Sequence, residues 1–128
     1  MHTSCYKVAF AIAVGIGLSA AAVEGLHAQA QRAGYVVAEI NVKNPDGYMK
    51  EFLPSAAKAI AEAGGKYVVR GGKTVSLQGE APPSRVVVLR FESIDKAQTW
   101  YDSLARRDSQ AIGDKYATFR IFLVECDR

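Results

Sequence analysis

Two short runs of β-branched residues, each close to glycines, constrain the fold of this chain more than any other feature. The first run occupies residues 66–70, between the glycine pairs 64–65 and 71–72, and the second occupies residues 85–91. Runs of this kind joined by a Gly/Pro-containing loop are typical of adjacent antiparallel strands. Helical patterns flank the two runs, so the sequence predicts a β-α-β-β-α-β order in one α+β domain.

Residues 1–30 have the pattern of a signal peptide. A polar start with Lys7 precedes an apolar run over residues 8–23, and Ala28-Gln29-Ala30 provides small residues at the spacing that signal peptidase accepts. We therefore expect cleavage after Ala30 and export to the periplasm or the medium, with no membrane contact afterwards. An uncleaved anchor is the alternative, although the run is marginal in length for a membrane span.

The composition of the remaining chain excludes several kinds of site. His2 and His27 are the only histidines and both precede residue 31, so histidine-based zinc sites and Ser-His or Cys-His nucleophile pairs are excluded. Loss of Cys5 with the signal would leave Cys126 without an intrachain disulfide partner. We predict no metal and no cofactor. The net charge is only +3 and the charges are interspersed, which does not favour nucleic-acid binding.

Local signals give the approximate bounds of the elements. Asn44-Pro45 should begin the first helix, Pro54 should kink or split it, and Gly64-Gly65 should end it. Ser93 should cap the second helix. The polar segment 106–117 gives no clear assignment. Strands are predicted over residues 35–42, 66–70 with a possible edge extension over 73–77, 85–91 and 119–125.

Strand alternation also predicts which side chains share a face. Val36, Ala38 and Ile40 should face the helices, whereas the third and fourth strands are apolar on both faces. A sheet with helices on one face only would leave the other apolar face in water. We therefore expect a homodimer in which the sheet of a second copy covers that face.

Four segments together resemble the DUF1330 family. The matching segments are residues 44–48, 64–72, 85–91 and 97–103, and the similarity covers about residues 34–125 of a domain that we expect over residues 34–127. The resemblance implies a ferredoxin-like protomer, an antiparallel sheet with helices on one face, and a dimeric α+β barrel. It implies no particular activity, because the family has no settled function.

This sequence departs from the family pattern at two places. Gln78-Gly79 stands where relatives usually carry Glu-Gly, and Ser103-Leu104-Ala105-Arg106 replaces the usual Ser-Pro-Glu-Tyr. The acidic side chain of the loop is therefore displaced by two residues, to Glu80, and a basic side chain stands in place of a tyrosine.

Charged residues on the predicted partner-facing side of the sheet are the candidate site. Glu39, as a possible catalytic base, would share an apolar interior with three arginines, and such charges need partners because unpaired burial is costly. In one interpretation Glu39 pairs with an arginine and the others reach solvent. In the other, spare arginines bind a ligand above aromatic residues. The candidate ligand-binding residues are Arg70, Arg90, Arg120, Tyr48, Trp100 and Tyr101.

Two functions remain open from the sequence. The first is binding of a small anionic or carbonyl-bearing molecule in a barrel pocket, with possible cofactor-independent acid/base catalysis. The second is a non-catalytic dimeric structural or stress-related interaction module with a solidly packed barrel. A cavity of roughly 300 Å³ or more lined by the arginines would favour the first function.

Overall fold

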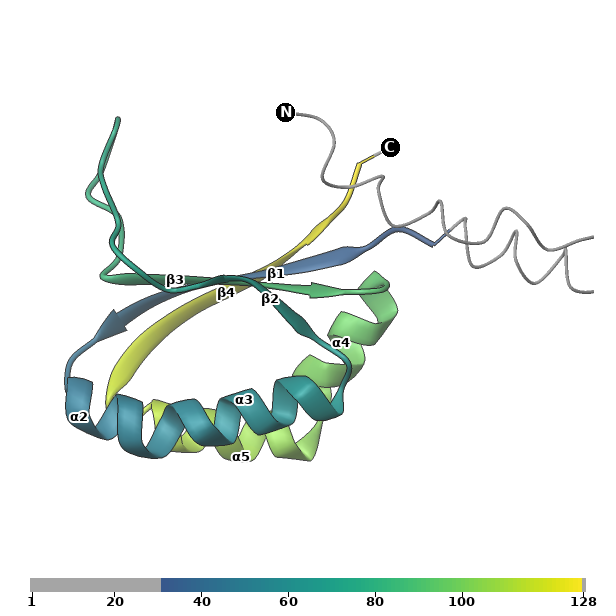
Figure 1. The fold of residues 1–128 in the computed structure, drawn as a ribbon, viewed down its shortest axis with the longest axis horizontal. Helices are drawn as coiled ribbons and strands as arrows, with labels where there is room; N and C mark the ends of the chain where they lie inside the picture. The colour runs from purple at the N-terminus through teal and green to yellow at the C-terminus, as the bar shows by residue number, and fades with distance from the viewer. Residues whose placement is uncertain (1–30, 128) are drawn as a thin grey trace, which may run out of the picture.

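A computed structural model describes residues 31–127, and the predicted signal peptide lies outside these residues. The domain has two layers, an antiparallel sheet and a layer of helices on one of its faces (Figure 1). The four strands are β1 (Gly34–Val42), β2 (Lys66–Arg70), β3 (Arg85–Phe91) and β4 (Ala117–Glu125), in the order β2-β3-β1-β4. This confirms the predicted α+β fold with a ferredoxin-like protomer. No helix within residues 31–127 is long and apolar enough to cross a membrane.

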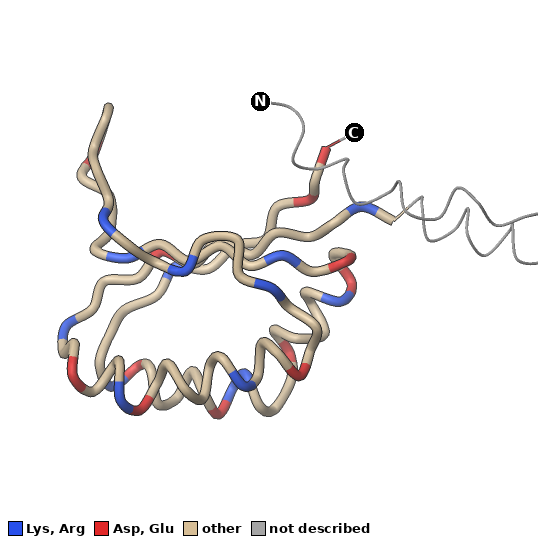
Figure 2. Tube along the Cα trace, viewed as in Figure 1, with Lys and Arg blue, Asp and Glu red and all other residues tan. Residues whose placement is uncertain are grey.

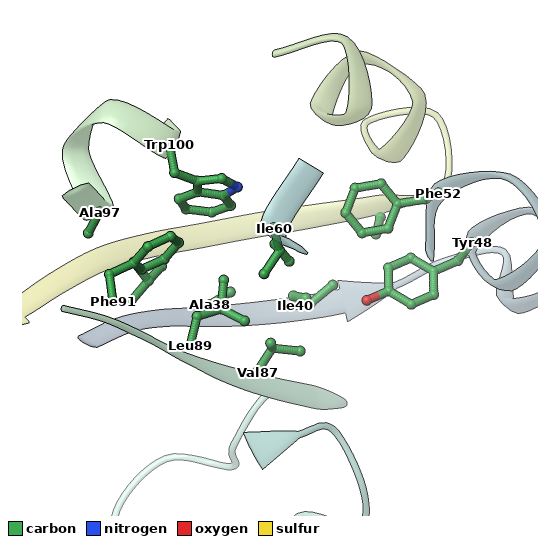
Figure 3. Packing of buried hydrophobic residues seen from close by; sticks show 12 residues of the cluster. Ala38, Ile40, Tyr48, Phe52, Ile60, Val87, Leu89, Phe91, Ala97 and Trp100 are labelled. Atoms are coloured by element: carbon green, nitrogen blue, oxygen red, sulfur yellow. The ribbon is translucent and has the colours of Figure 1, made fainter. Parts of the chain in front are cut away.

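The inner face of the sheet, defined as the face covered by helices, carries the core. Val36, Ala38 and Ile40 alternate as buried residues along β1, and Leu89 and Phe91 on β3 are 2% and 1% exposed. Phe91 packs against the ring of Trp100 at a centroid distance of 5.4 Å. Figure 3 shows Ala38, Ile40, Leu89, Phe91 and Trp100 among the packed side chains of this core. The alternation predicted from the sequence therefore holds for the two central strands.

Proline divides the first helical region as predicted. The Asn44 side chain caps α2 (Pro45–Gly47) by accepting a hydrogen bond from Gly47 N. A π-helical segment, η2 (Tyr48–Phe52), follows and leads into α3 (Leu53–Glu62), which has Pro54 in its first turn. Proline is tolerated there because the first amides of a helix need no intrahelical acceptor. The wider π turn brings Tyr48 and Phe52 to the core.

The second helical region continues beyond the predicted helix. Helix α4 (Ile94–Asp102) begins at the predicted Ser93 cap, and α5 (Leu104–Gly113) occupies most of the segment that the sequence left unassigned. The Ser103 hydroxyl accepts a hydrogen bond from Arg106 N and so caps α5. The close approach of Gly113 to the Phe52 ring seats this helix against η2.

Residues 71–84 form a projecting arm instead of the predicted edge-strand extension over 73–77. Gly71 and Gly72 have φ values of +85° and +135°, which turn the chain out of the sheet. The arm rises from the outer face of the sheet, opposite the helices (Figure 1). One side-chain hydrogen bond, from Thr74 Oγ1 to Pro83 O, joins its two limbs. The predicted edge-strand extension was wrong, because residues 73–77 pair with no strand of the sheet.

The outer face combines apolar and charged rows. The strand register aligns Val69, Val88, Val37 and Phe122 in one row across all four strands. Val69 and Phe122 are 44% and 41% exposed. Acidic and basic residues are interspersed along the helix layer (Figure 2). The domain therefore presents a charged helix layer on one side and a partly apolar sheet on the other.

The cysteine that follows β4 is not a free thiol. Cys126 comes directly after the last residue of the strand, is buried, and is disulfide-bonded. The expectation that it has no intrachain partner concerns a chain cleaved after Ala30, and that cleavage lies outside the described residues.

Candidate functional site

A cavity of about 70 Å³ lies between the inner face of the sheet and the helices. Its walls are mostly apolar and come from β1, β3, β4 and the helical segments η2, α3 and α4. Polar side chains also reach it from several elements. They are Tyr48, Tyr67, Arg70, Arg85, Trp100, Arg106, Ser109 and Gln110. Among the residues that line the cavity there is no aspartate or glutamate.

Three polar atoms of this lining are buried without a hydrogen-bond partner among residues 31–127. They are the hydroxyl of Tyr48, Nε of Arg85 and the indole Nε1 of Trp100. The whole side chains of Tyr48 and Trp100 are nearly inaccessible, since these residues are 2% and 6% exposed. Figure 3 shows the Tyr48 oxygen and the Trp100 nitrogen directed toward the middle of the core from opposite ends. Buried polar groups without partners are rare in folded proteins and need an explanation.

Tyr48 is held in its neutral, hydrogen-bond-donating form. Burial raises the pKa of its phenol above the ordinary value, and the Arg85 guanidinium, whose central carbon lies 5.5 Å from the ring centre, only partly opposes this. Burial also raises the pKa of Tyr67, against the opposing charges of Arg70 and Arg85. Both phenols therefore retain their protons at neutral pH.

Arg85 begins β3 and reaches across the base of the arm. Its NH2 group donates a hydrogen bond of 2.9 Å to the backbone oxygen of Arg70. Its guanidinium is also so close to Gly71 that a Cβ at that position would lie 2.6 Å from Cζ. Arg85 is paired in register with Ile40, an inner-face residue, which directs its side chain toward the helices. The arm and the cavity thus share this arginine.

Arg70 lies on the inner side of the sheet, contrary to the predicted partner-facing position. An irregularity in the β2–β3 pairing, between Tyr67 and Val69, shifts the register of the last residues of β2. As a result Arg70 pairs with Val87, an inner-face residue, and Val69 turns to the outer face. The Arg70 guanidinium packs over the Tyr67 ring, 4.5 Å from its centre. A period of two residues cannot reveal such a bulge.

Tyr101, the third aromatic candidate, lies outside the cavity. It is 40% exposed and carries the Arg106 guanidinium over its ring at 3.7 Å. Arg106 also donates to the backbone oxygen of Tyr101 and to Oε1 of Gln110. Arg106 therefore belongs to the lining, whereas Tyr101 supports it from outside.

Glu39, Arg90 and Arg120 lie on the outer face and none of them lines this cavity. Arg120 NH1 contacts both carboxylate oxygens of Glu39 at 3.1 Å, and its own side chain is 76% exposed. This is the arrangement in which Glu39 pairs with an arginine. Arg90 pairs in register with Tyr35 and is half-buried. A second, open hollow of about 310 Å³ includes Glu39 and Arg120 beneath Pro82 and Pro83 of the arm.

Arg85 lines the cavity but was omitted from the candidate residues, although the sequence contained a signal for it. Alternation over Arg85, Val87, Leu89 and Phe91 puts Arg85 on the same face as the core residues of β3. Tyr67, which pairs in register with the inner-face residue Leu89, also lines the cavity and was absent from the candidate set. No group of three or more metal-ligating side chains is found within residues 31–127.

The fold and the cavity define an α+β domain with a small donor-lined site between its sheet and its helices. The family profile described as a domain of unknown function, DUF1330, matches residues 33–126, and the chain belongs to that family. A comparison with curated proteins found no match.

Two solved structures resemble this domain in fold. The RPA0582 protein of unknown function from Rhodopseudomonas palustris is 10% identical, with a TM-score of 0.62, over 88% of this chain and 96% of its own. SnoaB, a cofactor-independent oxygenase from Streptomyces nogalater, is 15% identical, with a TM-score of 0.52, over 77% of this chain and 96% of its own. At these identities the likeness shows the fold alone.

Proposed function

We propose that this protein binds a small anionic or carbonyl-bearing molecule in the cavity between the inner face of its sheet and its helices. One observation carries the proposal: three buried donors, on Tyr48, Arg85 and Trp100, have no partner in residues 31–127 and line the same cavity. A buried donor left unsatisfied costs about 1–3 kcal/mol. A ligand oxygen can repay this cost, because an oxygen acceptor has lone pairs for more than one donor.

The proposed site is not the barrel pocket expected from the sequence. The cavity of about 70 Å³ is also smaller than the roughly 300 Å³ set as the criterion for ligand binding. The larger outer hollow reaches that size but contains only one of the three candidate arginines, and its guanidinium is already paired with Glu39. We prefer the smaller cavity because its donors are buried and unpaired.

Catalysis in this cavity would have to use tyrosine as the acid. Glu39, the candidate base, is on the opposite face of the sheet, and no carboxylate lines the cavity. The raised pKa of Tyr48 keeps its phenol protonated and makes it a weaker acid, so it suits a hydrogen-bond donor better than a general acid or base. The fold-level likeness to a cofactor-independent oxygenase is compatible with such chemistry, but we propose binding as the primary function.

The test uses Trp100, the only tryptophan of the chain, as an internal probe. Its indole N–H gives a single ¹⁵N–¹H resonance, which should shift saturably when acetate or acetamide is titrated into the protein. Tyr48→Phe should weaken binding about 2- to 10-fold, the effect of one hydrogen bond. Tyr35→Phe, on the outer face, is the matched control and should leave binding unchanged. Absence of a saturable shift with either probe would refute the proposal.

We also propose that a second copy of the chain covers the outer face, as expected from the apolar third and fourth strands. The apolar row Val69–Val88–Val37–Phe122 supports this, because Val69 and Phe122 are exposed, Val88 and Val37 are only partly buried, and contiguous accessible apolar surface marks interaction sites. Light scattering should give twice the monomer mass, and Phe122→Asp should give a folded monomer. A soluble wild-type monomer would contradict it and would also weaken the alternative, a non-catalytic dimeric module.

Export is proposed on the sequence of residues 1–30 alone. If it is correct, N-terminal sequencing of protein exported from a bacterial host will begin at or near Gln31. A membrane-bound product that retains Met1 would indicate an anchor instead.

A further inference from the structure

The charges around the inner cavity are all of one sign. Three arginines line it, Arg70, Arg85 and Arg106, and no acidic residue does. A cation in apolar surroundings needs a counter-charge, because burial of an unpaired charge is costly. The lining therefore favours a ligand that brings a negative charge.

Arg70 and Arg106 already have partners for their guanidinium groups. Arg70 packs over the Tyr67 ring, and it is exposed. Arg106 packs over Tyr101 and donates to Tyr101 O and to Gln110. These two arginines thus have protein contacts or water that satisfy them.

Arg85 is different, because NH2 donates to Arg70 O, the guanidinium approaches the Tyr48 hydroxyl closely enough to oppose the rise in the pKa of that phenol, and the buried Nε has no acceptor. The ion pairs found within residues 31–127 are Arg32–Glu125, Lys96–Glu92 and Arg120–Glu39, so none of them neutralises Arg85. Arg85 is therefore the cation of the cavity that lacks both a counter-ion and a full set of acceptors.

We infer that the ligand of this cavity is a short-chain monocarboxylate whose carboxylate pairs with Arg85. This inference rests on the proposed function and narrows it from any carbonyl-bearing molecule to an anion. A carboxylate accepts up to about four hydrogen bonds, enough for Arg85 Nε and the neighbouring Tyr48 hydroxyl. Hydrogen bonds between a guanidinium and a carboxylate are also about twice as strong as neutral ones.

The size and the walls of the cavity limit the rest of the molecule. A cavity of about 70 Å³ is far below the roughly 300–1,000 Å³ that pockets for drug-sized ligands have. Acids of two or three carbons suit this space, and aromatic or long-chain acids do not. Ile40, Ile60, Val87 and Leu89 line the cavity, so a methyl or ethyl group would meet apolar side chains.

The test compares each acid with its neutral amide at pH 7 and constant ionic strength. Acetate, acetamide, propionate and propionamide are titrated while the indole resonance of Trp100 is followed. Each acid should bind at least 10-fold more tightly than its amide. Arg85→Gln should remove this preference, and Arg85→Lys should retain part of it. Arg90→Gln is the control, because this arginine lies on the outer face.

The outcomes separate this inference from the proposed function. If acids and amides bind equally, or if Arg85→Gln keeps the preference, the inference fails and the proposed function stands. If benzoate or hexanoate binds more tightly than propionate, the chain-length limit is wrong. If no probe shifts the resonance, the cavity holds water only and both proposals fail. Circular dichroism of each variant checks folding, and Arg85→Lys serves where Arg85→Gln does not fold.

Discussion

The charged residues on the two faces of the sheet differ in their burial and in their partners. On the outer face, Arg120 lies against Glu39 at 3.1 Å and most of its side chain is in water. On the inner face, Arg85 lies beside the buried phenol of Tyr48, with its Nε buried and unpaired. The outer pair is complete as it stands, whereas the inner cluster is a set of donors without acceptors. This contrast is why we place the ligand site between the sheet and the helices.

The faces also differ in how their apolar residues contribute to stability. Phe91 on the inner face is 1% exposed and packs on Trp100, whereas Phe122 on the outer face is 41% exposed. Both lie on strands that pair with β1, so the difference comes from the helix cover. The outer face gains a comparable cover only if a second copy of the chain binds there.

The largest expected effect is the difference in stability loss when Phe91 and Phe122 are each truncated to alanine. Phe91→Ala should lower the free energy of unfolding by about 3–5 kcal/mol, the usual cost of truncating a buried aromatic residue. Phe122→Ala should cost under about 1 kcal/mol in a monomer. Urea titrations at several protein concentrations measure both values. A loss of stability for Phe122→Ala that grows with protein concentration would show that the outer face is covered by a second copy. If Phe91→Ala and Phe122→Ala instead lose the same stability at every concentration, the two faces do not differ in their contribution to stability.

The next effect concerns the base of the arm, where Gly71 touches the inner-face arginine. Gly71→Ala should cost roughly 1–3 kcal/mol, because φ is +85° and the new Cβ would lie 2.6 Å from Arg85 Cζ. Gly79→Ala is a matched control, since Gly79 has a φ of +83° and no atom within 4 Å of the added Cβ. Thermal unfolding measures the two losses.

The difference in stability loss between Gly71→Ala and Gly79→Ala measures the effect of displacing Arg85, because backbone strain is common to both variants. It should be accompanied by a shift of the Trp100 indole resonance in Gly71→Ala only. Equal destabilisation with no change in that resonance would mean that Arg85 is not held by the arm.

A smaller effect is expected from the outer ion pair. A double-mutant cycle with Glu39→Gln and Arg120→Ala should give a coupling of about 0.2–1 kcal/mol, because Arg120 is largely solvated and water screens the pair. Arg70→Ala should show no coupling to Glu39→Gln, since Arg70 is on the other face. Strong coupling between those two residues would contradict the bulge in β2.

The smallest effect is a pH dependence from Tyr48. Since burial raises the pKa of its phenol above the unfolded value, the folded state holds the proton more tightly, and stability must fall as pH rises above about 10. Tyr48→Phe should therefore lose less stability than the wild type between about pH 10 and 11.5. Tyr35→Phe is the control on the outer face. Parallel curves for Tyr48→Phe and the wild type would show that Tyr48 is not buried in solution.

Local signals in the sequence were sufficient for the main elements. Asn44, Pro45 and Ser93 predicted where helices begin, because capping depends on residues within one turn. Alternation in residues 35–42 and 85–91 predicted the inner face of the central strands, because both are regular. The family resemblance and the β-α-β-β-α-β order were also confirmed. Both depend on short segments that can be recognised one at a time along the chain.

Three features could not be read from local patterns. The arm and α5 depend on contacts with distant segments, such as Thr74 with Pro83 and Gly113 with Phe52. The position of Arg70 depends on a bulge relative to β3, which no period of two residues encodes.

The sequence by itself determined the β-α-β-β-α-β order, the absence of histidine from residues 31–128, and a set of arginines and aromatic residues from which any site must be built. Only the tertiary structure decided which of them meet. Strand pairing separated Glu39 from Arg70, and helix packing buried the polar atoms of Tyr48 and Trp100 against the cavity that Arg85 enters. Burial and pairing are properties of the whole packed domain, because each depends on which distant segments exclude water from a side chain.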